Sequence, residues 1–469
     1  MPPLVRYKIP IIGHTFSYLF DSVEFFAQCR KEYGDIFSLY IWGQVRTFVG
    51  KEHIHEVLAK DDVFSFKEMI RKKIPGDAMY AEGFGDSRYN IMVIKEYISK
   101  RLEIYNERMQ TSLHSSIQKY FGESREPKVF HNLHYPLNKV VAALIANIFV
   151  GEEEAKNDEV IATFAEFTSD MEIFLAIPPI LDFIYPGLQD FINRIPVRLG
   201  LYNPAAKHRN ILVKHIKKQV DKRLKERKVC QDSWKRPNDL IQEFIEEKNF
   251  DPNNIDCAAI ADKLAFIIFA SIITTSRSCT NAFIDLASRP EYIQELYEEQ
   301  LQIAKEADKS GILPFEALDK MKKLDSFVKE SLRLTGDVVG NPHLVLKDYT
   351  FSNGLQLPKN HVVDLYFDDI CQDKSLQGPN PKSFEPFRYV NKNSLASKIS
   401  KDFTVFGGGK HACPGRFIAT TQIKLFMHNI ILKYNFRTES GKVEEKLRIG
   451  PMTFPSACGV IFEKRNATN

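Results

Sequence analysis

The sequence predicts a mainly helical fold with a smaller β-sheet. Near the start, Ile36–Ile41 and Val45–Val49 have strand composition and flank Gly43-Gln44, a pair typical of a two-residue hairpin. After this hairpin and up to about residue 335, apolar residues recur mostly at helical spacing. Short strand-like runs return between Val345 and Tyr366. We therefore expect a helical body and a small sheet built from both ends of the chain.

The predicted helices differ in character. Lys207 to Lys228 carries ten Lys or Arg against two acids, which indicates a basic surface helix. The run Leu264–Thr275 is apolar, mixes small and large residues and is too short for a membrane span, so it predicts a buried helix. Ser288-Arg-Pro-Glu291 matches a capping box with an early proline and predicts the start of another helix. Apolar residues after Gly415 predict a last one.

Length and composition favour one large globular unit, and we expect residues 1–469 to form a single domain. The 469-residue chain shows no internal repeat, low-complexity segment or long Gly/Ser linker. Its seven cysteines form no Cys-x-x-Cys pair and no disulfide framework, which suits a reducing compartment. The net charge of +4 gives no nucleic-acid signal.

Cys413 carries the clearest chemical signal. It lies in a run from Phe406 to Gly415 that satisfies F-x-x-G-x-x-x-C-x-G, which would occur by chance in roughly one such chain per thousand. An iron-binding thiolate needs backbone N–H donors and shielding, because these set its potential. Glycines let the backbone wrap the sulfur, and the following helix favours an anion at its N-terminus. A buried inert cysteine in a glycine-rich loop is the alternative.

The run resembles the haem-thiolate loop of the cytochrome P-450 monooxygenases, and its KHACPGRF segment resembles the version found in fungal members. The resemblance implies the cytochrome P-450 fold and a haem b cofactor. It makes Cys413 the axial iron ligand, with Phe406, Gly407 and Gly415 shaping the loop. His411, two residues before the thiolate, takes the position that binds a haem propionate.

Glu330 and Arg333 lie three apart on a predicted helix and can pair directly. Taken alone, they form an ordinary surface ion pair. The resemblance implies instead that they are buried beneath the haem and tied to Arg388, in the segment Phe384-Glu-Pro-Phe-Arg-Tyr389. Removing one member of such a triad would strand a buried charge.

Ala270–Thr275 falls on the oxygen-activating segment of the family, although a plain core helix explains most of its residues. A hydroxyl inside a helix can bond the preceding turn and open space beside the iron. The resemblance makes Thr274 and Thr275 the catalytic hydroxyls that guide protons. Ile273 departs from the family, which commonly has Asp, Glu or His there. Protons would then arrive through waters and the hydroxyls of Ser271, Thr274 and Thr275.

Further cofactor contacts follow from position. His343 takes the place where relatives usually have a propionate-binding arginine, and a satisfied core or surface histidine is the alternative. The Trp-x-x-x-Arg helix of the family is missing. Lys100 and Arg101 could substitute for it, or could equally be solvated.

The family positions also predict a substrate pocket. It draws on the stretch Phe64–Phe84 and on apolar side chains spread over four further segments. These are Phe167, Met171, Phe174, Phe266, Ala270, Ile273, Val338, Val339, Met452 and Phe454. Such a lining suits a hydrophobic substrate, and the resemblance favours a steroid or terpenoid over a fatty acid.

Three surface features bear on partners and location. The basic helix is either a solvated face or a contact for anionic lipid. Cations surround the thiolate loop, and the resemblance implies that this face receives an acidic electron donor, an NADPH–cytochrome P-450 reductase with FAD and FMN. They are Lys398, Lys401, Lys410 and Arg416. Residues 1–14 resemble the proline-rich hinge after a membrane anchor, so we expect a chain that has lost its anchor and belongs on the cytoplasmic face of the endoplasmic reticulum. The apolar stretch Phe174–Ile184 predicts peripheral membrane contact, with a buried helix-turn as the alternative.

The predicted function is therefore a haem-thiolate monooxygenase that hydroxylates a hydrophobic substrate with O2 and electrons from the reductase. Two alternatives remain. Ile273 keeps open an isomerase or dehydratase of the same fold that needs no O2. A non-catalytic haem sensor would bind haem through Cys413 and turn nothing over.

Overall fold

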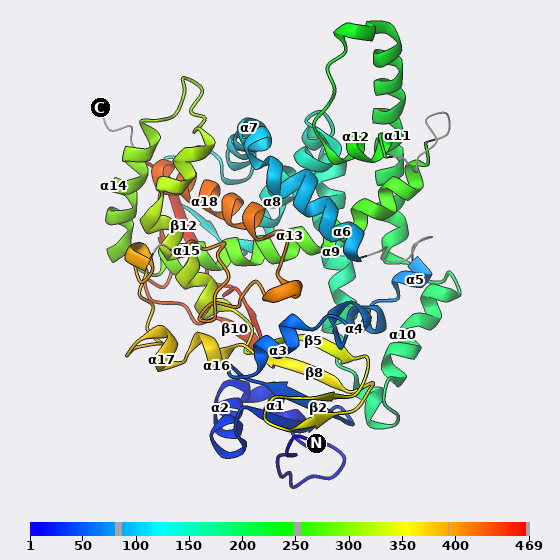
Figure 1. Ribbon diagram of the computed structural model, residues 1–469. Helices are drawn as coiled ribbons and strands as arrows, with labels where there is room; N and C mark the ends of the chain where they lie inside the picture. The colour runs from blue at the N-terminus through cyan, green and yellow to red at the C-terminus, as the bar shows by residue number, and fades with distance from the viewer. Residues whose placement is uncertain (80–86, 248–254, 393, 466–469) are drawn as a thin grey trace.

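The computed structural model describes residues 1–79, 87–247, 255–392 and 394–465. Its helices fill most of the molecule, and its main sheet lies at one end, next to the N-terminus (Figure 1). The α-helices are α1 (Thr15–Phe20), α2 (Ser22–Tyr33), α3 (Ile54–Ala59), α4 (Phe66–Lys73), α5 (Gly76–Met79), α6 (Ser87–Val93), α7 (Leu102–Phe121), α8 (His134–Val150), α9 (Asp158–Ala176), α10 (Leu188–Arg198), α11 (Pro204–Cys230), α12 (Leu240–Ile245), α13 (Cys257–Ala287), α14 (Ile293–Ala304), α15 (Lys322–Thr335), α16 (Asp368–Cys371), α17 (Lys374–Gln377) and α18 (Arg416–Lys433).

The strands come from both ends of the chain, as predicted. They are β1 (Ile36–Ile41), β2 (Gln44–Val49), β3 (Phe64–Ser65), β4 (Lys128–Phe130), β5 (Val339–Val345), β6 (Tyr349–Thr350), β7 (Gln356–Leu357), β8 (Val362–Tyr366), β9 (Tyr434–Thr438), β10 (Leu447–Ile449), β11 (Met452–Phe454) and β12 (Val460–Lys464). The main sheet has the order β1-β2-β8-β5-β3, with β2 and β8 parallel and the other neighbours antiparallel. A second sheet has the order β4-β12-β9.

The first hairpin is shifted by one residue from its prediction. Ile41 pairs with Gln44, so Trp42 and Gly43 form the turn. Their φ angles of 52° and 71° are both left-handed, as a type I′ turn requires. Tryptophan rarely adopts this conformation, which is why composition misplaced the turn.

Helix α13 runs through the middle of the helical region (Figure 1). It packs against α8, α9, α11, α15 and α18, and most of its side chains are buried. The expectation of a short core helix is wrong in length, because α13 has 31 residues and is long and apolar enough to cross a membrane. Its packing against five neighbours identifies it as the core helix of this fold.

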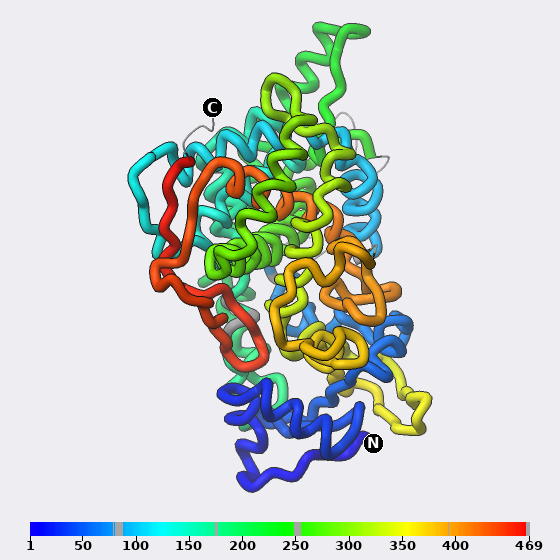
Figure 2. Tube along the Cα trace, turned by 90° about the vertical axis from the view of Figure 1, so that its left-hand side faces the viewer, coloured from blue at the N-terminus to red at the C-terminus, as the bar shows by residue number. Residues whose placement is uncertain are grey.

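Two surface predictions can be compared with the structure. Helix α11 projects beyond the body at its C-terminal end (Figure 2), and its cations face carboxylates of a neighbouring segment. These ion pairs are Lys207–Glu166, Lys214–Glu159, Lys218–Glu154 and Lys222–Glu153. They favour the solvated, ion-paired face over a lipid contact. The predicted capping box does not form, because Ser288 is the C-cap residue of α13 and donates its hydroxyl to the carbonyl of Ile284.

Candidate functional site

The loop that carries Cys413 is held by its own backbone. Cys413 N–H donates to the carbonyl of Phe406 at 2.8 Å, and Gly407 N–H donates to Thr404 at 2.7 Å. Gly407 and Gly409 have φ angles of +72° and +53°. A Cβ at Gly407 would lie 2.7 Å from the carbonyl oxygen of His411. The loop therefore needs glycine both for its left-handed backbone and for space.

The Cys413 sulfur lies just before the N-terminus of α18, which begins at Arg416. Burial raises the pKa of the Cys413 thiol, whereas backbone N–H donors of Gly415 and Arg416 and the Arg416 charge act to lower it. Arg416 also fixes the loop, since its guanidinium donates to the carbonyls of Cys413 at 2.8 Å and Ser397 at 3.1 Å. A bound metal cation would complete the stabilisation of the thiolate that these donors begin.

The loop residue His411, which is partly buried, lies beside the fully buried His343. The rings of His343 and His411 are 4.9 Å apart in an edge-to-face arrangement. Within the described residues, neither Nε2 atom has a hydrogen-bond partner. Burial lowers the pKa of both histidines, that of His343 to about 3. Unpaired buried polar atoms are costly, so two of them side by side indicate a missing polar partner.

The carboxylates of a haem fit this partner. His411 can donate from Nε2 as a neutral ring. His343 Nδ1 already donates to the carbonyl of Asn341 at 2.6 Å, so its Nε2 can donate only after the ring gains a proton. A propionate would favour that protonation, because a nearby anion raises a histidine pKa. The residues present therefore fit a haem held by Cys413 through its iron and by His411 and His343 through its carboxylates.

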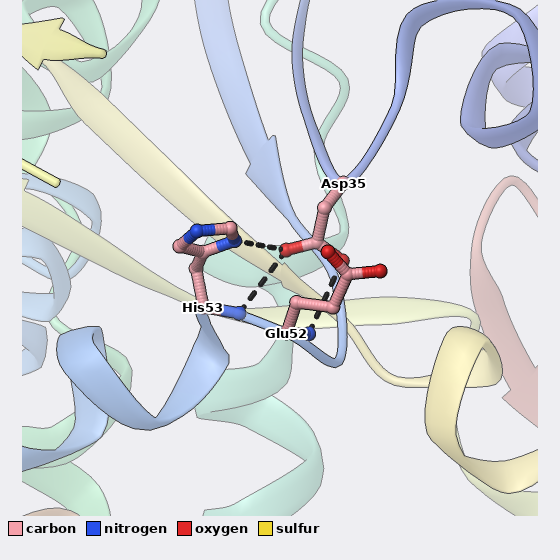
Figure 3. A group of neighbouring side chains, drawn as sticks. All are labelled: Asp35, Glu52 and His53. Carbon is pink, nitrogen blue, oxygen red and sulfur yellow. Dashed lines mark hydrogen bonds and ion pairs between the residues drawn. The ribbon is translucent and has the colours of Figure 1, made fainter. Parts of the chain in front are cut away.

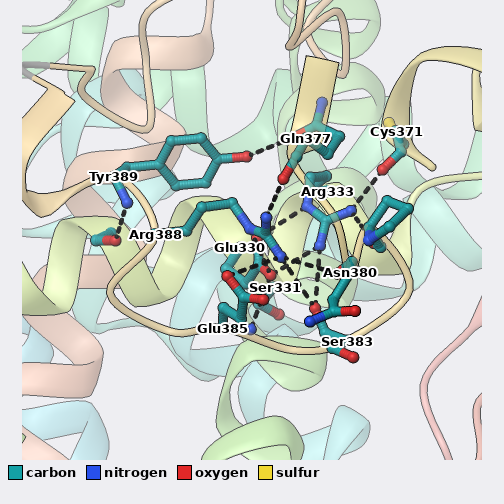
Figure 4. A network of polar contacts seen from close by, with 12 residues as sticks. Glu330, Ser331, Arg333, Cys371, Gln377, Asn380, Ser383, Glu385, Arg388 and Tyr389 are labelled. Carbon is teal, nitrogen blue, oxygen red and sulfur yellow. Dashed lines mark hydrogen bonds and ion pairs between the residues drawn. The ribbon is translucent and has the colours of Figure 1, made fainter. Parts of the chain in front are cut away.

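The three charges of the Glu330 triad meet as predicted; Glu330 and Arg333 are fully buried, and the Arg388 side chain is 5% exposed (Figure 4). Arg333 donates to both carboxylate oxygens of Glu330, at 2.7 and 2.8 Å. Arg388 donates to the same carboxylate at 3.2 Å and also bonds the carbonyl of Gln377. Arg333 further donates to the carbonyls of Cys371 at 2.5 Å and Pro381 at 2.6 Å. The triad thus ties α15 to the segment that leads toward the Cys413 loop.

Helix α13 keeps accessible surface along one stripe although it lies in the core. Ala270 and Thr274 are exposed, and Phe266, Ile273 and Arg277 are partly exposed. Residues three and four apart share a helix face, so these five side chains lie along one face of α13. The stripe contains both the predicted catalytic Thr274 and Ile273, which replaces the acid or histidine expected at that position.

The hydroxyls of this segment are bonded to the helix itself. Thr274 Oγ1 donates to the carbonyl of Ala270 at 2.9 Å, and Ser271 Oγ donates to Ile267 at 2.6 Å. Thr275 is buried on another face. Thr274 is therefore the exposed hydroxyl of this segment that could exchange its helix partner for a ligand, and its catalytic role stays a prediction.

The predicted pocket residues separate into two groups. Phe266, Ala270, Ile273, Met452 and Phe454 keep accessible surface. The other five, Phe167, Met171, Phe174, Val338 and Val339, are buried, and their lining role stays a prediction. Phe167 packs on His208 of α11, while Val338 and Val339 pack in the core under the sheet. In the stretch Phe64–Phe84, Phe64 is buried and residues 80–84 lie outside the described residues.

Lys100 and Arg101, the possible substitutes for the missing Trp-x-x-x-Arg helix, both pair with nearby carboxylates. Lys100 is exposed and pairs with Glu96 at 2.7 Å. Arg101 pairs with Glu243 at 2.6 Å and stacks on Tyr97. Because both cations already pair with these carboxylates, the solvated alternative describes them better than a cofactor contact.

A group of side chains that was not predicted lies at the end of β2. Asp35 accepts hydrogen bonds from the backbone N–H groups of Glu52 and His53, at 3.2 and 3.1 Å, and from His53 Nδ1 at 2.7 Å (Figure 3). Arg30 lies 3.1 Å from Asp35 and 2.8 Å from Glu52. Since Arg30 neutralises the carboxylates and backbone donors occupy Asp35, the group closes the turn into α3 and we assign no metal to it.

Sequence reasoning also missed Arg277 and Glu172, which pair at 2.6 Å between α13 and α9. The available signal was that Arg277 is the single charged residue between Lys263 and Asp285. Its partner could not be found from the sequence, because the two residues are 105 positions apart.

Comparisons with known proteins agree with this geometry. A family model described as Cytochrome P450 matches residues 2–456. The chain is 32% identical over 348 residues to Cytochrome P450 monooxygenase 71 of Postia placenta, covering 71% of this chain and 65% of that relative. It is 29% identical over 319 residues to Cytochrome P450 monooxygenase olcJ of Penicillium canescens, covering 66% and 57%. It is 27% identical over 417 residues to Cytochrome P450 monooxygenase hepE of Aspergillus oryzae, covering 84% and 71%. The matched part thus spans slightly less than two thirds of the first of these relatives. With a family match over nearly its whole length, the chain belongs to the cytochrome P450 family.

Proposed function

We propose that this chain acts as the single catalytic domain of a haem-thiolate monooxygenase that hydroxylates a hydrophobic substrate. The observation that carries the proposal is the Cys413 loop, in which backbone N–H groups approach the sulfur at the start of α18. The relatives described above are named monooxygenases, which supports the same activity. Bound haem would supply the redox chemistry that activates dioxygen.

The chain's own residues position the reaction. Cys413 would hold the iron, and the Glu330 triad would keep the supporting segments in place. Thr274 would hold a proton at Oγ1 and release its bond to Ala270 when a ligand arrives. With Ile273 in the usual acid position, Ser271 and waters would have to carry the remaining protons. The accessible aromatic and aliphatic side chains of α13 and β11 suit burial of a steroid or terpenoid body.

The electron donor we propose is an NADPH-dependent flavoprotein reductase containing FAD and FMN. Lys398, Lys401 and Lys410 are exposed near the thiolate loop, and Phe417 beside them is also exposed. A basic rim around an apolar contact suits an acidic partner, and its association rate should fall as salt rises.

We further propose peripheral contact with the endoplasmic reticulum membrane from the cytoplasmic face. The segment between α9 and α11 carries many exposed apolar side chains. They are Ile177, Ile180, Ile184, Tyr185, Phe191, Leu199, Leu201 and Tyr202. So many exposed apolar side chains within one segment suit a lipid contact, because aliphatic and aromatic groups can enter the boundary between headgroups and acyl chains. Liposome flotation with and without an Ile184→Asp, Leu201→Asp double variant tests it. Equal flotation of both proteins would contradict the contact.

The activity itself is tested with the reductase, NADPH and a screen of steroids and terpenoids. We expect a ligand that shifts the iron spin state and stimulates NADPH and oxygen consumption together with a hydroxylated product. An isomerase or dehydratase, the alternative that Ile273 keeps open, would instead convert its substrate with neither reductase nor oxygen. A sensor would show the spin shift without any product.

A further inference from the structure

Arg277 is a charged side chain on the accessible stripe of α13. It lies three residues after Thr274 and seven after Ala270, the two exposed positions of that stripe. This spacing keeps it on the same helix face. Its side chain is 23% exposed, although the helix is otherwise packed in the core. Arg277 therefore lies on the same accessible face of α13 as Thr274.

The partners of Arg277 come from three other segments. Its Nη2 donates to Glu172 of α9 at 2.6 Å. Its guanidinium lies 4.4 Å from the centre of the Phe454 ring in β11. Asp337, which precedes β5, interacts electrostatically with Arg277 and accepts a hydrogen bond from Thr453 N–H at 2.8 Å. The pair thus interrupts a lining that sequence reasoning expected to be wholly apolar.

The pair has hydrogen-bonding capacity left for a ligand. A guanidinium has five N–H donors, and the contact with Glu172 occupies one of them. Glu172 is 33% exposed, so its carboxylate can still accept a bond. The charge of Arg277 is already balanced by Glu172, and Asp337 adds further negative charge nearby. A neutral oxygen can therefore join the pair, whereas a carboxylate would be repelled.

We propose that the Arg277–Glu172 pair anchors the polar end of the substrate, so that the substrate is a hydrophobic molecule already carrying a hydroxyl or carbonyl oxygen away from the reacting carbon. This inference rests on the proposed function, because it assumes that the space beside Thr274 is the substrate pocket. It narrows the substrate class to oxygenated steroids or terpenoids. It also explains why an ion pair lies on this face, since a wholly apolar ligand would leave the remaining hydrogen-bonding groups of the pair without partners.

The test uses 1-alkylimidazoles of graded chain length with methyl, hydroxyl or carboxylate ends. The imidazole nitrogen binds the haem iron and gives an optical shift, so binding is measured without turnover. We expect the hydroxyl-ended probe to bind about tenfold more tightly than the methyl-ended one at the length that reaches Arg277. Arg277→Met should remove this preference. Glu172→Gln should weaken the discrimination against the carboxylate-ended probe, because it removes the carboxylate that pairs with Arg277 and leaves only Asp337 as a negative charge nearby.

Arg289→Met is the matched control. Arg289 also pairs with a carboxylate, Asp285 at 3.2 Å, and stacks on an aromatic ring, Phe384 at 4.3 Å, but it follows the C-terminal end of α13. The Arg289→Met substitution should leave the preference for the hydroxyl-ended probe unchanged. Two outcomes would overturn this inference but not the proposed function: an optical shift with no preference for the hydroxyl-ended probe at any length, or a preference that survives Arg277→Met. Either one would mean that the Arg277–Glu172 pair only ties α9 to α13. No optical shift in the wild-type protein would overturn the proposed haem site and the inference with it.

Discussion

Replacing Arg333 with alanine should destabilise the protein strongly and release its haem. Glu330 and Arg333 are both fully buried, and Arg333 makes two bonds to Glu330 and one each to the carbonyls of Cys371 and Pro381. The substitution leaves the Glu330 charge with Arg388 alone. Breaking a buried pair in this way costs about 3–5 kcal/mol. Since domains are typically stable by about 5–15 kcal/mol, a large part of the stability would be lost.

The assay is urea unfolding followed by circular dichroism and by haem absorbance, with the haem-to-protein ratio of the purified variant. Glu68 and Arg71 provide a matched control, because they have the same three-residue spacing at 3.3 Å but side chains that are 40% and 52% exposed. Arg71→Ala should cost less than about 1 kcal/mol. An Arg333→Ala protein with full haem content and a free energy of unfolding within that same margin would refute the reasoning.

Two further predictions concern a buried histidine and the thiolate loop. His428 donates to Gln300 at 2.9 Å, and burial lowers its pKa to about 4, so the stability it contributes is complete above pH 6.5 and is lost as the pH falls toward 4. At pH 5 this loss of stability is about 2 kcal/mol. Urea unfolding midpoints measured at pH 7.5 and pH 5 should show that His428→Gln removes it. An equal loss of stability at pH 5 in both proteins would contradict the role given to His428. Gly407→Ala should lower the temperature at which haem is released, because the new Cβ would lie 2.7 Å from the His411 carbonyl oxygen. Gly441→Ala, at φ +66° with nothing within 4 Å, should change haem release little, and equal effects of the two alanines would exclude the clash as the cause.

The features that could be predicted from the sequence are those fixed by local chemistry. The Cys413 loop was recognisable because its glycines are required by backbone angles that few other residues adopt. Glu330 and Arg333 were recognisable because three-residue spacing places them on one helix face. Their roles toward a cofactor stay predictions.

The features that were missed depend on the tertiary structure. The partner of Arg277 is on a different helix, and no local pattern connects them. The burial of Phe167 and Met171 depends on which face of α9 meets its neighbours, and family position alone did not show this. Ser288 failed as a helix N-cap because its hydroxyl could bond the preceding turn instead.

The most direct test of the account is a carbon-monoxide difference spectrum of the reduced protein, recorded for wild type, Cys413→Ser and Cys458→Ser. Cys458 is a partly buried free cysteine like Cys413, and burial raises the pKa of both thiols. If Cys413 holds the haem iron, the wild type and Cys458→Ser should both show a red-shifted thiolate band, and Cys413→Ser should lose it. A wild-type spectrum without that band, or a band that persists in Cys413→Ser, would contradict the claim that Cys413 holds a haem iron.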